Sequence, residues 1–320
     1  MTVTKAERSV DLAAFGPTTT RVASREEAQR WCRKLTRTQG ENFSVLSRFV
    51  EPGLVDDFSA VYAFCRAADD LGDEAECREQ ATEYLAWWRH ELQRCFRGEA
   101  SHPVFVALAP VIARHSLPIE PFADLIGAFE SDQVKTRYQT WDEVLEYCEG
   151  SANPVGRLVL MVLGEPRTDE SFRASDAICT ALQLTNHWQD AKRDYIERDR
   201  IYIPRDSWKS DDFEARFGST CRKGYAPDKE FLVQWREMLR ELCGKTGEMY
   251  EQGSSLLPMI APKNRSMIWL FMAGGLRTLQ EIERWNFETC IARPRVSTFA
   301  KMWLLFRARR ETRTSGVVQG

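Results

Sequence analysis

Apolar residues recur with the helical period along most of this chain, and that pattern restricts the fold more than any other feature. Amphipathic helices place apolar residues at i, i+3, i+4 and i+7, whereas half-buried strands alternate apolar and polar residues. The chain has no convincing alternating segment. The sequence therefore predicts an all-α protein. The predicted helices cover residues 24–38, 54–73, 76–97, 103–115, 119–132, 140–150, 155–163, 170–198, 226–256, 263–286 and 297–312.

The breaks between these segments coincide with glycine and proline residues, which interrupt regular structure. Residues 199–225 are the least regular stretch. No linker rich in Pro, Gly or Ser divides the chain, and no internal repeat occurs, so we expect one domain over residues 21–312. Residues 1–20 and 313–320 are expected to form flexible ends.

The composition is that of a soluble globular protein. Hydrophobic residues make up 43% of the 320 positions and charged residues 28%. The formal net charge of −3 gives no reason to expect nucleic acid as a partner. The nine cysteines include no C-x-x-C pair, which favours reduced thiols over zinc or disulfides. Without a signal-peptide core or an apolar stretch of about 20 residues, a cytoplasmic protein is expected.

The stretch AFCRAADDLGDE, residues 63–74, gathers carboxylates in a segment of helical period. At about 100° per residue, one narrow stripe contains four side chains: Tyr62, Arg66, Asp69 and Asp73. The opposite side is apolar and is expected to pack against another helix. Carboxylates at i and i+4 destabilise a helix unless something neutralises them. A solvated surface with Arg66 as the partner is one explanation.

A second acidic segment, LQLTNHWQDAKRDYIERDRIYIP, covers residues 182–204. Asn186, Asp190 and Asp194 recur every fourth residue and form a polar ridge roughly 12 Å long, beside a separate apolar stripe. A solvated helix face would explain this segment too when it is taken alone.

The two acidic segments together indicate a metal-dependent reaction. Magnesium prefers oxygen ligands and usually takes one or two carboxylates while a phosphate supplies the rest. Two such rows facing each other across a cavity would hold a cluster of magnesium ions, and a diphosphate would balance the charge. Metal ions then stabilise the charge on the leaving diphosphate. Arg66 and Arg200 are candidates for direct contacts with phosphate oxygens.

The two motifs resemble the aspartate-rich motifs of the squalene/phytoene synthase family. The resemblance extends over about residues 25–310. It is carried by the segments YAFCRAADDLGDE, QLTNHWQDAKRDYIERDRIYIP, ENFSVLSRF, DLIGAFESDQVKTRYQTWDEVLEYCEGSANPVGRLVL and ARPRVSTFAKMWLLFRA. It implies an isoprenoid synthase fold, a single helical bundle around a central cavity, and an enzyme that uses a magnesium-bound diphosphate.

The segment YCEGSANPVGRL, residues 147–158, indicates a subgroup. Phytoene and dehydrosqualene synthases typically have AGxVG after YC. This segment, with ENF, is more similar to the hydroxysqualene synthases of bacterial hopanoid pathways. That resemblance implies presqualene diphosphate as the substrate, rearrangement of a cyclopropylcarbinyl cation, and capture of the cation by water. Hydroxysqualene and diphosphate would result, and no NADPH is expected.

The resemblance also assigns the metal ligands. Asp69 and Asp73 match the ligands of the first motif. Asn186, Asp190 and Asp194 match those of the second, and Asn186 is also expected near the diphosphate.

Other positions match residues that surround the ligands. Asp70 is expected to support a ligand or a water molecule. Tyr62, Arg66 and Gln183 match positions near the diphosphate or the reacting end of the substrate. One extra residue before RIY, relative to several family members, leaves the role of Arg200 open.

Two segments keep two interpretations each. Asn153-Pro154 marks either a helix that begins at Pro154 or, with Ser151, a polar pocket that holds the attacking water, which makes Asn153 a catalytic candidate. The C-terminal stretch FAKMWLLFRARRETR is either a packed last helix with a charged tail or a basic amphipathic helix on an anionic membrane surface. The second interpretation implies peripheral contact at the inner membrane face.

Two other functions stay open. The first is head-to-head condensation of farnesyl diphosphate to presqualene diphosphate, squalene or a phytoene-type product. The second is a non-catalytic scaffold, against which five oxygen ligands in register argue. The sequence leaves the oligomeric state undetermined.

Overall fold

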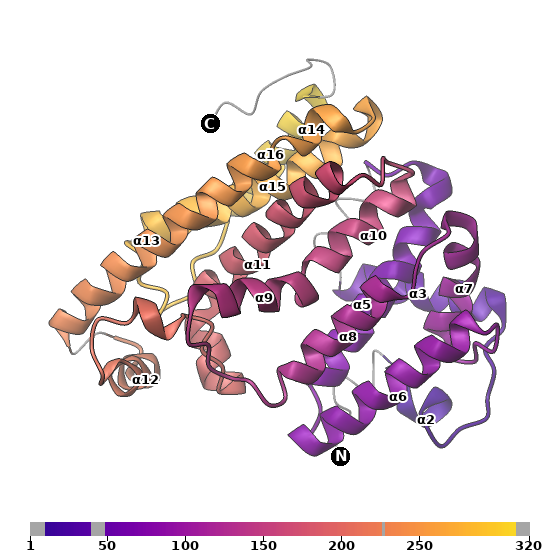
Figure 1. Cartoon of the computed structure of the whole chain (residues 1–320), viewed down its shortest axis with the longest axis horizontal. Helices are drawn as coiled ribbons and strands as arrows, with labels where there is room; N and C mark the ends of the chain where they lie inside the picture. Colours follow the sequence, from indigo (N-terminus) through magenta and orange to yellow (C-terminus); the bar gives the residue numbers. More distant parts are fainter. Residues whose placement is uncertain (1–9, 40–48, 226–227, 312–320) are drawn as a thin grey trace. The chain divides into compact units, whose positions relative to one another are not determined.

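The computed structural model describes residues 10–39, 49–225 and 228–311, and Figure 1 shows their helices. Within these ranges the regular structure is helical, apart from one isolated parallel β-bridge between Arg137 and Ile201. The all-α prediction is confirmed. The ENF segment lies almost entirely outside the described residues, as does the predicted tail over 313–320.

The long helices begin and end within a few residues of the predicted bounds. They are α3 (Arg25–Gln39), α5 (Val55–Asp73), α6 (Arg78–Phe96), α7 (Pro103–His115), α8 (Glu120–Ser131), α9 (Trp141–Ser151), α10 (Asn153–Leu163), α11 (Asp169–Arg198), α13 (Lys229–Gly253), α15 (Pro262–Arg284) and α16 (Thr298–Glu311).

Several short elements were not predicted: α2 (Leu12–Phe15), η1 (Pro52–Leu54), η2 (Arg205–Ser207), α12 (Phe213–Lys223) and α14 (Leu256–Met259). α12 lies within residues 199–225, the least regular stretch of the sequence, and its buried Phe213 and Phe217 share a face at i and i+4. Near the N-terminus, Val10 and Phe15 are buried, so part of the segment expected to be flexible is packed.

The chain divides into two compact units. The N-terminal unit comprises Met1–Val134 and Pro154–Arg167. The C-terminal unit comprises Lys135–Asn153 and Thr168–Gly320. The first acidic motif belongs to the N-terminal unit and the second to the C-terminal unit.

In the N-terminal unit, α5 packs against α3, α6, α7 and α8. The Phe64 ring lies 5.0 Å from Phe122, 5.9 Å from Phe105 and 6.0 Å from Trp88, centroid to centroid. The predicted apolar side of α5 is fully packed: Val61, Phe64, Ala68 and Leu71 are buried. The polar stripe of the same helix consequently lies outside the aromatic core.

In the C-terminal unit, α11 packs against α13, α15 and α9. The buried Trp188 indole donates from Nε1 to Thr246 Oγ1 on α13 at 2.9 Å, and Thr185 Oγ1 lies 3.0 Å from Tyr250 Oη. Gly253 on α13 lets the two helices approach closely, because an added Cβ would lie 2.5 Å from Ile178 Cγ1 on α11.

The break before Pro154 is a helix start. α9 ends at Ser151, Ala152 has a non-helical backbone, with φ −125° and ψ −47°, and α10 begins at Asn153. Proline is tolerated in the first turn of a helix because its missing N–H would have no partner there. The helix-start interpretation is confirmed.

Candidate functional site

The polar stripe of α5 is half-buried and centres on Arg66. The Arg66 guanidinium lies with Nη1 3.1 Å from Asp69 Oδ2, and Nη2 donates to Asp70 Oδ1. The Asp69 side chain is 37% exposed, whereas the Asp70 side chain is fully buried. Asp70 therefore holds Arg66 from the inner side of the helix; that it supports a metal ligand or a water molecule stays a prediction.

Arg66 and Tyr62 keep their ordinary protonation states. Burial opposes the charge of Arg66, but Asp69 and Asp70 together raise its pKa above the usual value. Burial also raises the pKa of the Tyr62 phenol, against the opposing effect of Arg66. The stripe consequently offers one guanidinium and one neutral phenol.

The C-terminal end of α5 is acidic. Asp70 and Asp73 lie in its last turn, which contains no basic residue. The helix macrodipole disfavours negative charge at a C-terminus. This end of α5 is therefore electrostatically suited to a cation.

The second acidic row lies on α11 and is more deeply buried. Asp190 is 5% exposed and Asp194 8%, whereas Asn186 is exposed. Gln183, one turn before Asn186, is half-buried. The ridge predicted from the four-residue spacing is thus open at its Asn186 end and enclosed at its aspartate end.

Arginines surround the two buried aspartates. Arg193 Nη2 lies 2.7 Å from Asp190 Oδ2, and Arg293 donates to both carboxylate oxygens of Asp190, with Nη2 3.2 Å from Oδ2. Asp194 Oδ1 lies 3.7 Å from Arg198 Nη1. A buried carboxylate stays charged only when such partners compensate its lost hydration.

Arg293 was not predicted from the sequence. It lies after α15, in a segment that α11 fastens by two further bonds: Gln189 Nε2 donates to Pro294 O at 2.8 Å, and Lys192 Nζ to Ile291 O at 2.8 Å. The segment ARPRVS contributed to the family resemblance, but no local pattern connects it with a carboxylate 103 residues earlier.

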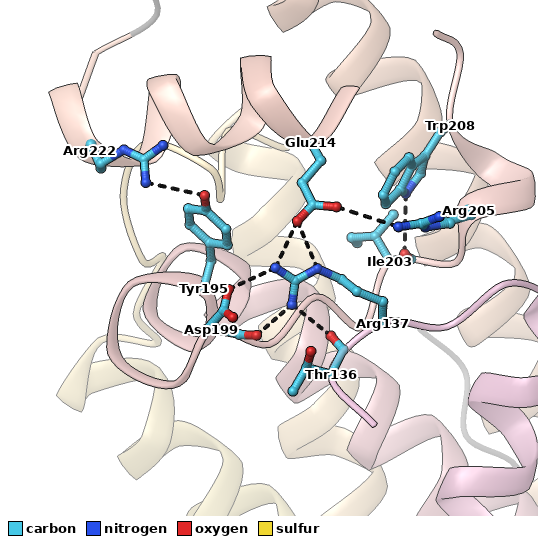
Figure 2. A network of polar contacts seen from close by, with 9 residues as sticks. All are labelled: Thr136, Arg137, Tyr195, Asp199, Ile203, Arg205, Trp208, Glu214 and Arg222. Carbon is cyan, nitrogen blue, oxygen red and sulfur yellow. Dashed lines mark hydrogen bonds and ion pairs between the residues drawn. The ribbon is translucent and has the colours of Figure 1, made fainter. Parts of the chain in front are cut away.

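Figure 2 shows the polar network that fixes the chain after α11. Asp199 caps α11 in the left-handed conformation, with φ 52°. Arg137 donates to Glu214 Oε1 from Nε at 3.0 Å and from Nη2 at 2.8 Å, and Nη2 also donates to Asp199 Oδ1 at 2.7 Å. One guanidinium thus ties Asp199 to α12.

The residue after Asp199 is the predicted phosphate contact Arg200. Arg200 is 7% exposed, and its N–H donates to Asp194 O at 3.1 Å. Ile201 N–H donates to Thr136 O at 2.9 Å, beside Arg137. The network therefore fixes the position of Arg200 relative to the second acidic row.

Aromatic rings pack around Tyr202, two residues after Arg200. Tyr202 stacks on His187 with 3.7 Å between ring centroids, and Tyr147 and Tyr138 lie 5.3 and 5.6 Å from Tyr202. Burial, with a smaller effect of Arg200, lowers the pKa of His187 to about 3. The imidazole is therefore neutral at physiological pH and functions as a packed ring.

Of the two polar side chains predicted to hold the attacking water, one is hydrogen-bonded and the other has no partner among the described residues. Asn153 is buried, and its Oδ1 accepts from Thr180 Oγ1 on α11 at 3.0 Å. Ser151 Oγ is shielded from solvent and has no hydrogen-bond partner among the described residues. Buried hydroxyls of this kind commonly bind ordered water.

In the part of the chain that the structure describes, no cluster of three or more His, Cys, Asp or Glu side chains is arranged to hold a metal ion. The structure brings together the predicted residues of each unit separately. In the N-terminal unit these are Tyr62, Arg66, Asp69, Asp70 and Asp73. In the C-terminal unit, Gln183, Asn186, Asp190 and Asp194 lie along α11 and Arg200 follows its end, whereas Asn153 contacts α11 nearer its start, at Thr180. That the two rows face each other across a cavity stays a prediction.

Comparison with known proteins decides the family. The model of the squalene/phytoene synthase family matches residues 36–300, most of the chain. The chain belongs to the squalene/phytoene synthase family.

The similar proteins include hydroxysqualene synthases. The hydroxysqualene synthase of Rhodopseudomonas palustris is 43% identical over 167 residues, which are 52% of this chain and 56% of that protein. The match thus spans little more than half of that relative. The hydroxysqualene synthase of Sinorhizobium fredii is 35% identical over 223 residues, 69% of this chain and 71% of that protein.

A solved structure supports the same fold. The squalene synthase HpnC from Alicyclobacillus acidocaldarius is 39% identical, with a TM-score of 0.71, over 88% of this chain and 99% of that one. The predicted isoprenoid synthase fold is confirmed, and the chain belongs with isoprenoid-processing enzymes. Among the described residues, no helix has the length and apolarity needed to cross a bilayer.

Proposed function

We propose that this family member is a magnesium-dependent hydroxysqualene synthase, which converts presqualene diphosphate and water to hydroxysqualene and diphosphate. One observation carries the proposal: α5 and α11 each present carboxylates at i and i+4 with arginine beside them. Among the activities known in the family, the hydroxysqualene synthases that this chain resembles, including those of Rhodopseudomonas palustris and Sinorhizobium fredii, support this one.

The donor atoms suit magnesium. Asp69 and Asp73 on α5, with Asn186, Asp190 and Asp194 on α11, offer only oxygen, and no thiol or imidazole is among them. A magnesium ion that binds a diphosphate needs one or two protein carboxylates, so neither row has to supply three. When bound, magnesium would supply Lewis-acid stabilisation of the charge on the departing diphosphate.

Two arginines beside Asp190 would bind diphosphate directly. Arg293 and Arg193 pair with Asp190 and remain 39% and 42% exposed. A guanidinium binds phosphate oxygens in the same forked geometry as a carboxylate. We propose that these arginines hold the charge of Asp190 until substrate arrives and then turn to the diphosphate, which releases the carboxylate for metal binding.

On α5 the side chains would orient the leaving group. Asp70, fully buried, holds Arg66, so the guanidinium keeps its charge and its direction. The neutral phenol of Tyr62, one turn before Arg66, can donate a hydrogen bond to a phosphate oxygen.

The water that ends the reaction would bind beside Asn153. Thr180 holds Oδ1 of Asn153, while the shielded hydroxyl of Ser151 has no partner among the described residues. We propose that Ser151 Oγ binds this water and that Asn153 positions the turn that carries it. Asn153→Ala should then divert product from the alcohol to hydrocarbons, whereas an unchanged alcohol yield would remove this pocket from the mechanism.

One assay separates the candidate functions. The purified chain is given magnesium with presqualene diphosphate or farnesyl diphosphate, each with and without NADPH, and products are identified by mass spectrometry. Hydroxysqualene from presqualene diphosphate, lost on adding EDTA and indifferent to NADPH, is the expected result. Inertness towards both substrates would instead support a scaffold.

A second candidate is condensation of farnesyl diphosphate. It is favoured by the solved structure that is 39% identical, which is that of a squalene synthase. Consumption of farnesyl diphosphate in the same assay would support it.

A further inference from the structure

The last helix exposes an apolar face. Four large side chains of α16 are between half and four-fifths exposed: Phe299 77%, Met302 56%, Trp303 52% and Phe306 63%. They occupy positions i, i+3, i+4 and i+7 and so share one side of the helix. We call these four residues the α16 outer face.

The opposite side of α16 packs into the core. Leu304 and Ala308 are buried, α16 packs against α15, and Ser266 Oγ on α15 donates to Ala308 O at 2.8 Å. The packing of the helix therefore does not require the α16 outer face. Contiguous exposed apolar side chains of this size mark an interaction site.

Positive charge borders the α16 outer face. The guanidinium carbon of Arg307 lies 5.4 Å from the Trp303 ring centre and 5.6 Å from that of Trp269. Lys301 is exposed. At about 100° per residue, Arg307 flanks the face on one side, and the sequence adds Arg309, Arg310 and Arg313 after it. Glu311 is the only acidic residue in the sequence from 299 to 313.

We propose that the α16 outer face binds an anionic lipid surface. Aromatic side chains favour the boundary between headgroups and acyl chains, and flanking arginines pair with anionic headgroups. Lipid fits better than a second copy of this chain, because two copies of the face would bring like-charged borders together. This interaction goes beyond the proposed reaction and does not depend on it.

The test measures vesicle binding by the full chain. Vesicles of phosphatidylcholine alone are compared with vesicles that contain phosphatidylglycerol, by co-sedimentation. The double variant Trp303→Ser, Phe306→Ser removes half of the face. Trp285→Ser is the matched control, because Trp285 is 48% exposed in the same unit but lies outside α16. Circular dichroism verifies that each variant is folded.

The expected result is binding of the wild-type chain to the anionic vesicles only, weakened by salt, with an affinity about tenfold lower in the double variant and unchanged in the control. Equal binding by the double variant, equal binding to neutral vesicles, or no vesicle binding would overturn the proposal. A wild-type dimer that the double variant abolishes would also overturn it, in favour of self-association. Turnover of detergent-solubilised presqualene diphosphate, measured separately, tests the proposed reaction without involving this face.

Discussion

The two acidic helices compensate their carboxylates in different ways. On α5, Asp69 is 37% exposed and its partner Arg66 comes from the same helix. On α11, the side chain of Asp190 is 6% exposed, and one of its partners, Arg293, comes from a segment 103 residues later. A half-exposed carboxylate keeps much of its hydration, whereas a buried one requires fixed partners.

This difference has a consequence for ligand binding. A cation at the end of α5 would compete mainly with water and with Arg66. A cation at Asp190 would displace guanidinium groups that are themselves suited to diphosphate. We therefore expect the α11 row to depend on substrate for metal binding more strongly than the α5 row does.

The first prediction, which has the largest expected effect, compares one aspartate from each acidic row. Asp190→Asn and Asp73→Asn should each lower kcat by about a thousandfold, equivalent to about 4 kcal/mol of transition-state stabilisation. Their stabilities should differ. Asp190→Asn leaves two guanidiniums facing a neutral amide and should cost about 2 kcal/mol of unfolding free energy, whereas the half-buried Asp73 should change it by less than about 1 kcal/mol.

Chemical denaturation and turnover assays verify this pair, with Glu197→Gln as the control. The Glu197 side chain is 59% exposed on α11, so its replacement should alter neither property. Equal destabilisation by the two aspartate variants would contradict the proposed difference between the buried and the half-exposed row. Near-normal turnover of either variant would contradict the assignment of that aspartate as a ligand.

A second prediction concerns the partner from the distant segment. Arg293→Ala should lower kcat/KM by about thirtyfold, or about 2 kcal/mol, because Asp190 and the diphosphate would both lose a forked partner. Arg293→Lys should recover only part of this loss, since an ammonium cannot form two parallel bonds. The control is Arg295→Ala, two residues further and exposed. An equally large loss of kcat/KM in Arg295→Ala would show that the positive charge of the segment matters, and not the specific pairing of Arg293.

A third prediction addresses the network in Figure 2. Arg137→Ala should cost about 2 kcal/mol of stability, because it leaves Glu214 and Asp199 without their shared guanidinium. Because the network also fixes Arg200, the proposed phosphate contact, KM for presqualene diphosphate should rise more than kcat falls. Arg222→Ala, which removes a 3.3 Å bond to Tyr195 Oη and a cation–π contact with the same ring, serves as the control. An unchanged KM would confine Arg137 to a stabilising role.

The fourth prediction is a pH dependence in the N-terminal unit. Burial lowers the pKa of His102 to about 4, and Val10 O opposes the shift by pairing with Nε2 at 2.8 Å. The folded protein then binds fewer protons than the unfolded chain below pH 6.5. Stability should therefore fall as pH decreases from about 6.5 to 4, by up to about 1.4 kcal/mol per pH unit from this group.

Denaturant titrations at several pH values measure that slope. His102→Asn can still accept from Val104 N–H at the start of α7 but does not titrate, so it should flatten the curve. His90→Asn, at an exposed position on α6, should leave the slope unchanged. A slope that survives in His102→Asn would assign it to other groups.

Much of the fold was predictable because helix formation leaves a local signal. The apolar period gave the bounds of the long helices, and the spacing of Asp69, Asp73, Asp190 and Asp194 identified both acidic helices before their contacts were known. The short helix α12 was missed, since its signal consists mainly of Phe213 and Phe217 within an otherwise polar stretch. Short helices are held by packing, and that signal is not local.

The sequence by itself determined that this protein is helical, that carboxylates recur at i and i+4 on two of its helices, and that both motifs match one family. These properties depend on residues a few positions apart, which the helical period relates directly. Only the tertiary structure decided that Arg293 pairs with Asp190, that Arg137 ties Asp199 to α12, and that one face of α16 stays exposed. Such contacts join residues that are distant along the chain, and the packing of whole helices, rather than any local period, brings them together.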